Sequence, residues 1–139
     1  MDKKSLLLAF SFLAVAPLVH AADAGEPGKV IVGLYHAAPG KQLELLKWLA
    51  TREAVDKEAG VAAQQVYAHT DGDSWDYMVV APQLTDAESA KVDEIAKKKG
   101  LKTGIQAGLE FRTMVQTHTD TFARGPMTAA DMVKAATGK

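Results

Sequence analysis

Apolar and polar positions divide the chain into one long apolar run near its start and a series of periodic segments after it. The run covers residues 6–19 and follows a short basic start. Val19 and Ala21 then supply small residues at the positions that a signal peptidase reads. The run is shorter than the roughly 20 residues that a bilayer requires. We therefore expect a signal peptide over residues 1–21, export to a bacterial periplasm and no membrane segment in the mature form.

The periodicity after a flexible leader at residues 22–28 alternates between strand and helix. Apolar residues at both even and odd positions predict a strand over residues 29–36 with both faces covered. A helical repeat follows over residues 41–57, and Gly60 ends it. Two strand patterns flank strong turn chemistry and predict a hairpin. These strands cover residues 63–69 and 75–81, and the turn is Asp71-Gly72-Asp73.

The second half of the chain carries clear helix signals. Thr85 and Glu88 have the spacing of a capping box, which predicts a helix that ends at Gly100. Residues 102–115 keep helical spacing, so we expect mostly helix there, although a strand starting near Phe111 is an alternative. β-Branched residues predict a last strand over residues 116–123. We therefore expect one domain over residues 29–123 and a tail over residues 124–139 with a short helix.

This order of elements predicts an α+β fold of the ferredoxin-like split βαβ type. Right-handed crossovers give an antiparallel four-stranded sheet in the order 4-1-3-2, with an extra helix before the last strand. The helices cover one face of this sheet. The other face still carries Val30, Val32 and Leu34, and an exposed apolar face of that size requires a cover. A second copy of the chain is the simplest cover, so we expect a homodimer.

The element order, the domain size and the two-faced sheet resemble the dimeric α/β-barrel superfamily. This group includes antibiotic-biosynthesis-type monooxygenases and stress-responsive barrel proteins, and the resemblance extends over residues 29–123. It implies a dimeric barrel. It does not imply one activity, because these relatives differ widely in chemistry.

Charge and composition exclude several classes of function. Without residues 1–21, two of the 16 basic and one of the 17 acidic residues are lost, which leaves a net charge of −2. This balance argues against a nucleic-acid or anionic-membrane partner. The chain has no cysteine, which excludes disulfides, thiol catalysis and covalent c-type haem. No phosphate loop, dinucleotide fingerprint, serine elbow or HExxH pattern is present, so the sequence identifies no cofactor.

The strongest candidate site is a group of histidines that the topology brings to one end of the sheet. His36 ends the first strand, and His118 begins the neighbouring fourth strand, so these two residues form the proposed centre. His69 ends the second strand and contributes to the rim. Trp75 from the hairpin and Tyr35 from the first strand are candidates to line a pocket for a flat ligand, although positions in the core or in a dimer interface are the preferred interpretation for such aromatic residues.

The histidines allow more than one interpretation. Three neutral imidazoles can bind Zn²⁺ or another transition metal, and one histidine can serve as a general base. Alternatively, they are ordinary half-exposed residues at strand ends. Their spacing matches no metal motif, so we predict no metal site. Two functions follow: a barrel with a small-ligand-binding or structural role, or a small monooxygenase-like enzyme acting on a flat organic substrate at a histidine-centred site. The first is preferred because no catalytic signature is visible.

Overall fold

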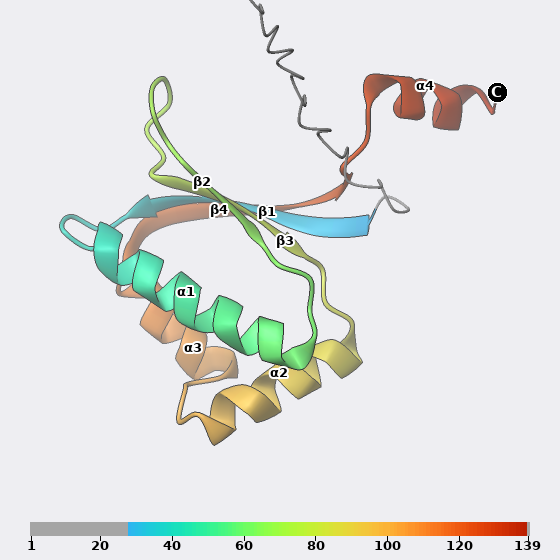
Figure 1. The fold of residues 1–139 in the computed structure, drawn as a ribbon. Coiled ribbons are helices and arrows are strands. Elements are labelled where there is room, and N and C mark those ends of the chain that lie inside the picture. Colours follow the sequence, from blue (N-terminus) through green and yellow to red (C-terminus); the bar gives the residue numbers. More distant parts are fainter. Residues whose placement is uncertain (1–27, 139) are drawn as a thin grey trace, which may run out of the picture.

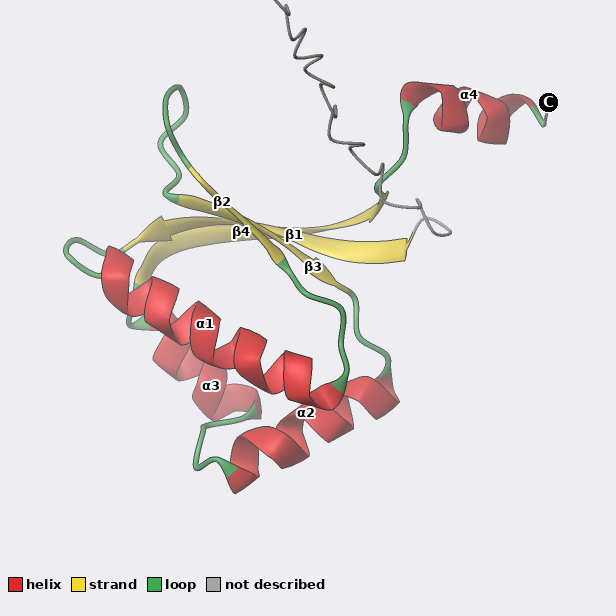
Figure 2. Cartoon of the chain, viewed as in Figure 1, coloured by secondary structure: helices red, strands yellow, loops and turns green. Residues whose placement is uncertain are grey.

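A computed structural model describes residues 28–138 and shows an antiparallel sheet with three helices on one of its faces (Figure 1). Figure 2 shows the same layers by secondary structure. The expected signal peptide and residues 22–27 of the leader lie outside the described residues. Within them, no helix has the length and apolar character needed to cross a membrane.

The elements follow the predicted order. Their bounds are β1 (Gly28–Ala37), α1 (Gln42–Ala59), β2 (Gln65–Ala68), β3 (Tyr77–Pro82), α2 (Asp86–Lys98), α3 (Gly104–Arg112), β4 (Val115–Gly125) and α4 (Ala129–Thr137). The strands lie in the order β2-β3-β1-β4, and all three neighbouring pairs are antiparallel. Read from the other edge, this is the predicted order 4-1-3-2. The ferredoxin-like fold with an extra helix before the last strand is therefore confirmed.

Local signals account for most of the boundaries. Thr85 and Glu88 form the expected capping box at the start of α2, and Gly60 ends α1 in the left-handed conformation, at φ 80°. The hairpin differs from the prediction, because β3 begins at Tyr77 and Trp75 lies in the connection. Asp71 and Asp73 accept hydrogen bonds from the backbone of the residues that follow them, which continues the turn beyond the predicted three residues.

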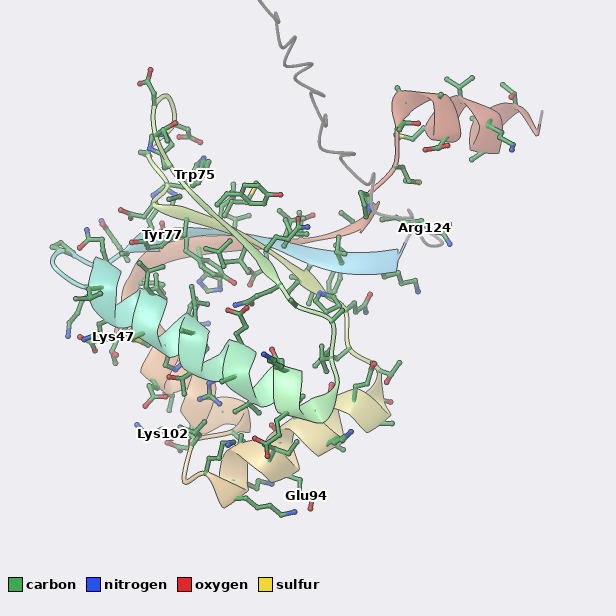
Figure 3. All side chains as sticks on the ribbon, viewed as in Figure 1. Lys47, Trp75, Tyr77, Glu94, Lys102 and Arg124 are labelled. Carbon is green, nitrogen blue, oxygen red and sulfur yellow. The ribbon has the colours of Figure 1, made fainter. Side chains whose placement is uncertain are left out.

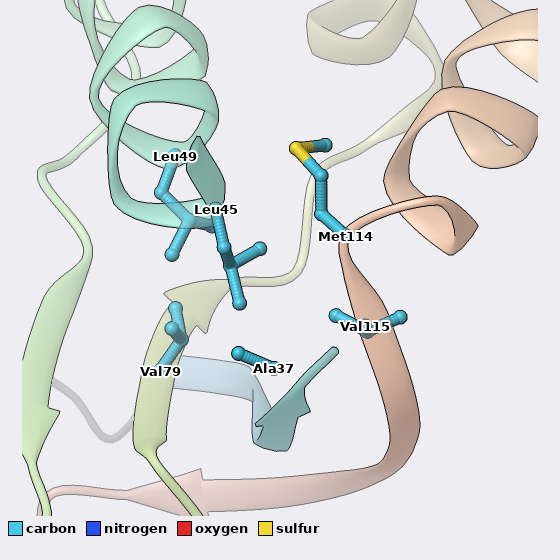
Figure 4. Close-up of a cluster of buried hydrophobic side chains, with 6 residues drawn as sticks. All are labelled: Ala37, Leu45, Leu49, Val79, Met114 and Val115. Carbon is cyan, nitrogen blue, oxygen red and sulfur yellow. The ribbon is translucent and has the colours of Figure 1, made fainter. Parts of the chain in front are cut away.

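The core lies between α1 and the end of the sheet where β1 stops (Figure 4). Leu45 and Leu49 of α1 pack there against residues of three strands and of the corner between α3 and β4. The other buried members are Ala37, Val79, Met114 and Val115. Leu46, an apolar residue of the same helix, is exposed. The apolar stripe of α1 is therefore narrower than its sequence suggests.

The two faces of the sheet have different surroundings. Tyr35 and Ala37 of β1 pack toward the helices. Alternate residues of a strand point to opposite faces, so Val30, Val32 and Leu34 point away from the helices. Their direct partners on β3 are Pro82, Val80 and Met78. We call these six residues the open face. In Figure 1, α4 lies on this same side of the sheet, beyond its end, and none of its residues is buried.

Candidate functional site

A cleft separates the sheet from the helices at the end opposite the core. Its volume is about 460 Å³. Ile31, Ala81 and Phe122 form the sheet side, and the end of α1 and the start of α2 provide the other walls. We call this the sheet–helix cleft, and its principal lining residues are Ile31, Asp56, Val61, Ala81, Ser89 and Phe122. Its size and mixed lining are typical of sites for small organic molecules.

Asp56 is the titratable side chain in the lining of this cleft. It lies in the last turn of α1, and it also lines an adjoining hollow of about 290 Å³ with Glu53 and Lys57. Burial raises the pKa of the Asp56 carboxyl above its usual value, with Arg52 opposing the rise and Glu53 adding to it. A half-buried carboxyl with a raised pKa in a cleft is a typical feature of a functional site.

Asp56 was not among the site residues predicted from the sequence. It lies outside the apolar face of the helical repeat at residues 41–57, where a charged residue is usually solvated. One signal was nevertheless available. An acid in the last turn of a helix faces the negative end of the helix dipole, where a cation is favoured. The helix dipole therefore does not stabilise the Asp56 carboxylate.

Tyr35 points along β1 toward the cleft. The end of its ring lies over Gly33, where an added Cβ atom would come within 2.6 Å of the ring. Gly33 separates Tyr35 from Ile31 on the helix side of β1, so the phenol lies back along the strand in the direction of Ile31, which lines the cleft. Burial, with a further contribution from the charge of Asp120, raises the pKa of Tyr35 to about 12. The phenol is therefore neutral at physiological pH and can donate a hydrogen bond.

His118 belongs to an aromatic cluster on the helix side of the sheet. Its ring centre lies 5.3 Å from that of Phe111 and 6.4 Å from that of Tyr35, with edge-on geometry in both pairs. The His118 Nε2 atom lies 3.3 Å from the Asp120 Oδ2 atom. Phe111 also contacts Trp48 of α1, at 5.3 Å between ring centres. These contacts connect β4 to α3 and α1.

The predicted pair of His36 and His118 is divided by the sheet. Tyr35, not His36, is the direct partner of His118 on the neighbouring strand. Directly paired residues share a face, and successive residues alternate, so His36 points to the side away from the helices. The two strand ends do meet as predicted, but the imidazoles lie on opposite faces. A single site centred on both histidines is therefore incompatible with this register.

His69 and Trp75 form a separate contact at the hairpin. Their ring centres lie 5.0 Å apart in an edge-on arrangement. Figure 3 shows Trp75 on the hairpin, at the end of the sheet that is far from Arg124. Residues 28–138 contain no group of three or more side chains able to hold a metal ion. Of the five predicted site residues, Tyr35 and His118 come together, and His69 and Trp75 come together, while His36 points to the open side of β1.

Comparison with known proteins gives likenesses of fold. No family model matches the chain, and a search of curated proteins finds no match. Among solved structures, the cofactor-independent oxygenase SnoaB from Streptomyces nogalater, as its N63A mutant, aligns with a TM-score of 0.47 and 17% identity, over 76% of this chain and 98% of that one. A dimeric ferredoxin-like protein of unknown function from Thermobifida fusca aligns with a TM-score of 0.46 and 12% identity, over 72% of this chain and 92% of that one. A dimeric ferredoxin-like protein from an uncultured marine organism aligns with a TM-score of 0.45 and 12% identity, over 74% of this chain and 90% of that one.

Proposed function

We propose that this protein is a periplasmic homodimer that binds a small organic ligand in the sheet–helix cleft. The cleft is the observation that carries this proposal. Ile31, Ala81 and Phe122 offer an apolar surface, while Asp56 and Ser89 converge on it from the helices. An apolar surface with a few placed polar groups gives affinity through the first and orientation through the second.

A carboxyl of the cleft and a phenol on the helix side of β1 have complementary roles. Asp56 carries a carboxylate that accepts hydrogen bonds from a ligand. The Tyr35 phenol, whose pKa is raised to about 12, is protonated and can donate. A flat ligand that lies on the apolar sheet surface would meet a donor near β1 and an acceptor on α1. This arrangement replaces the histidine-centred site as the best-supported location for binding.

The homodimer is proposed because the open face remains without a cover in one copy of the chain. Val32, Leu34 and Val80 lie at its centre and are half-buried. A mostly apolar hollow of about 400 Å³ extends this surface beside Val30 and Pro126. On the same side, α4 exposes Met132 and Val133. A nine-residue helix without packing is marginal in water, so a second copy that covers the open face would also stabilise α4.

Native mass spectrometry of protein purified from the periplasm of its own bacterium tests all three parts. The expected result is a dimer of chains that start at Ala22, with a bound small molecule. Phe122→Ala should lose the bound mass, whereas Leu109→Ala, an exposed apolar residue on α3, should keep it. A ligand-free monomer would contradict the proposal, and a chain that still starts at Met1 would contradict export.

A second candidate function is catalysis of the small monooxygenase-like type. The observation that favours it is the raised pKa of Asp56 in the cleft, because a half-buried carboxyl is suited to proton transfer. The test uses the compound found by native mass spectrometry, incubated with the protein in air. An enzyme of this type would insert one atom of O2 into the compound and reduce the other to water with two electrons from the compound itself, and Asp56→Asn would bind the compound without converting it. A compound that is unchanged after prolonged incubation would argue against catalysis and leave ligand binding as the proposed function.

A further inference from the structure

The sheet–helix cleft continues to the end of the sheet. A shallow hollow lined by Lys29, Gln83, Phe122, Ala123 and Arg124 shares Gln83 and Phe122 with the cleft. We call it the end hollow. Phe122 is 73% exposed, although it lies directly opposite Ile31 on the helix side of the sheet. An apolar surface therefore extends from inside the cleft to solvent, with no described side chain covering the phenyl ring.

Two cations stand at the outer limit of this apolar surface. Lys29 on β1 and Arg124 on β4 are direct partners in the strand register. They form the next pair on the same face of the sheet as Ile31 and Phe122, two residues further toward its end. Like charges directly opposite each other destabilise a strand pair. None of the ion pairs among residues 28–138 includes Lys29 or Arg124. Figure 3 shows Arg124 at this end of the sheet.

We propose that the end hollow and the sheet–helix cleft together bind a flat hydrophobic carboxylate. This inference rests on the proposed function and names its ligand class. The carboxylate lies between Lys29 and Arg124, where it relieves their mutual repulsion. The guanidinium of Arg124 can pair with it in a bidentate manner. The apolar body of the ligand covers Phe122 and Ile31 and enters the cleft toward Asp56.

The shape of the site supports an elongated ligand over a compact one. The cleft and the end hollow have volumes of about 460 Å³ and 550 Å³ and meet at Phe122. Of these two hollows, Asp56 and Ser89 line the cleft, and Lys29 and Arg124 line the end hollow. The site thus carries cations at one end and an acceptor at the other. The carboxylate of an aromatic acid matches the cation end of this distribution of charge.

Calorimetric titration of the wild-type dimer with 2-naphthoate and with the neutral 2-naphthamide tests the inference. We expect 2-naphthoate to bind roughly tenfold more tightly, as a charge-assisted hydrogen bond implies. Arg124→Gln and Lys29→Gln should each remove most of this preference while binding of 2-naphthamide persists. Phe122→Ala should weaken the binding of both compounds. Arg112→Gln, an exposed arginine at the end of α3, is the matched control and should change neither.

Charge reversal provides a second measurement on a folded variant. Arg124→Glu should lose 2-naphthoate and gain binding of 2-naphthylmethylammonium. Equal affinity of the wild type for 2-naphthoate and 2-naphthamide would overturn the inference and leave the proposed cleft function standing. Failure of both compounds to bind would also overturn it, and native mass spectrometry would then decide separately whether the cleft holds a ligand at all. If Arg124→Gln and Lys29→Gln both keep the full preference for 2-naphthoate over 2-naphthamide, the role of the two cations is likewise contradicted.

Discussion

The indole Nε1 atom of Trp48 donates a hydrogen bond to the Oε2 atom of Glu110, at 3.0 Å, and so joins α1 to α3. Arg52 lies over the Trp48 ring, 4.8 Å from its centre, and its guanidinium is 3.5 Å from the same carboxylate. Lys102 approaches the other carboxylate oxygen at 3.2 Å. This group of contacts closes the helix layer beside the aromatic cluster that holds Tyr35.

Loss of the Glu110 charge should therefore weaken the fold in a pH-dependent manner. The hydrogen bond from Trp48, with help from Lys102 and Arg52, lowers the pKa of Glu110 from its usual 4.5. A lowered folded-state pKa gives stability above pH 4.5 that is lost as the pH falls through the folded value. Glu110→Gln should cost about 1 kcal/mol at pH 7, a modest figure because the carboxylate is partly exposed. Urea unfolding should show that the difference in unfolding free energy between the wild type and Glu110→Gln vanishes well below pH 4.5. A difference that stays constant with pH would contradict this role of the Glu110 charge.

Leu45 should be far more important to stability than its neighbour Leu43 on the same helix. The Leu45 side chain is fully buried, whereas Leu43 is 63% exposed. Leu45→Ala leaves a cavity in the core and should cost about 3 kcal/mol. Leu43→Ala should change stability by less than about 0.5 kcal/mol. Urea unfolding of both variants measures this, and similar costs would mean that α1 packs through a different face.

The open face predicts how the proposed dimer can be separated. Leu34 lies near the centre of this face, between Met78 on β3 and Thr119 on β4. Leu34→Glu places a charge in the proposed interface and should yield a folded monomer, because an unpaired charge cannot be buried cheaply. Leu109→Glu, on the 54% exposed Leu109 of α3, should remain dimeric. Sedimentation velocity distinguishes the two results, and a dimeric Leu34→Glu would place the interface elsewhere.

Asp56 should be a residue whose charge costs stability. Its pKa is raised above 3.8, chiefly by burial. A raised folded-state pKa of an acid means that the neutral form is favoured on folding, so stability falls as the pH rises through 3.8 to the folded value. Asp56→Asn should therefore be more stable than the wild type at pH 7 and equal to it below pH 3.8. Thermal unfolding at both pH values tests this, with Asp71→Asn in the exposed turn as the control. A less stable Asp56→Asn at pH 7 would show a structural role for the carboxylate.

The fold was predictable because its signals are local and agree with one another. The capping box at Thr85, the turn at Gly60 and the apolar pattern of β1 each specify one element, and the order of the elements then limits the topology. The predicted meeting of the ends of β1 and β4 followed from that topology. The length of β2 did not, because Gln65–Ala68 is an exposed edge strand whose ends depend on pairing rather than on pattern.

The site was less predictable because it depends on register and on helix placement. A shift of one residue in strand pairing moves a side chain to the other face of a sheet. His118 pairs with Tyr35 rather than with His36, and that single step separates the two histidines. The cleft at Asp56 depends on how far α1 and α2 stand from the end of the sheet. That distance is set by packing between elements remote in sequence.

The location of the ligand is the central claim, and an NMR titration of isotope-labelled protein with 2-naphthoate tests it most directly. We expect the largest backbone shift changes at the residues of the sheet–helix cleft and the end hollow. These residues include Ile31, Asp56, Ala81, Phe122 and Arg124. The open face, with Val32 and Leu34, and the hairpin, with His69 and Trp75, should change little. Shift changes concentrated at His36, His69 and Trp75 would contradict the account and restore a site at the histidine end of the sheet.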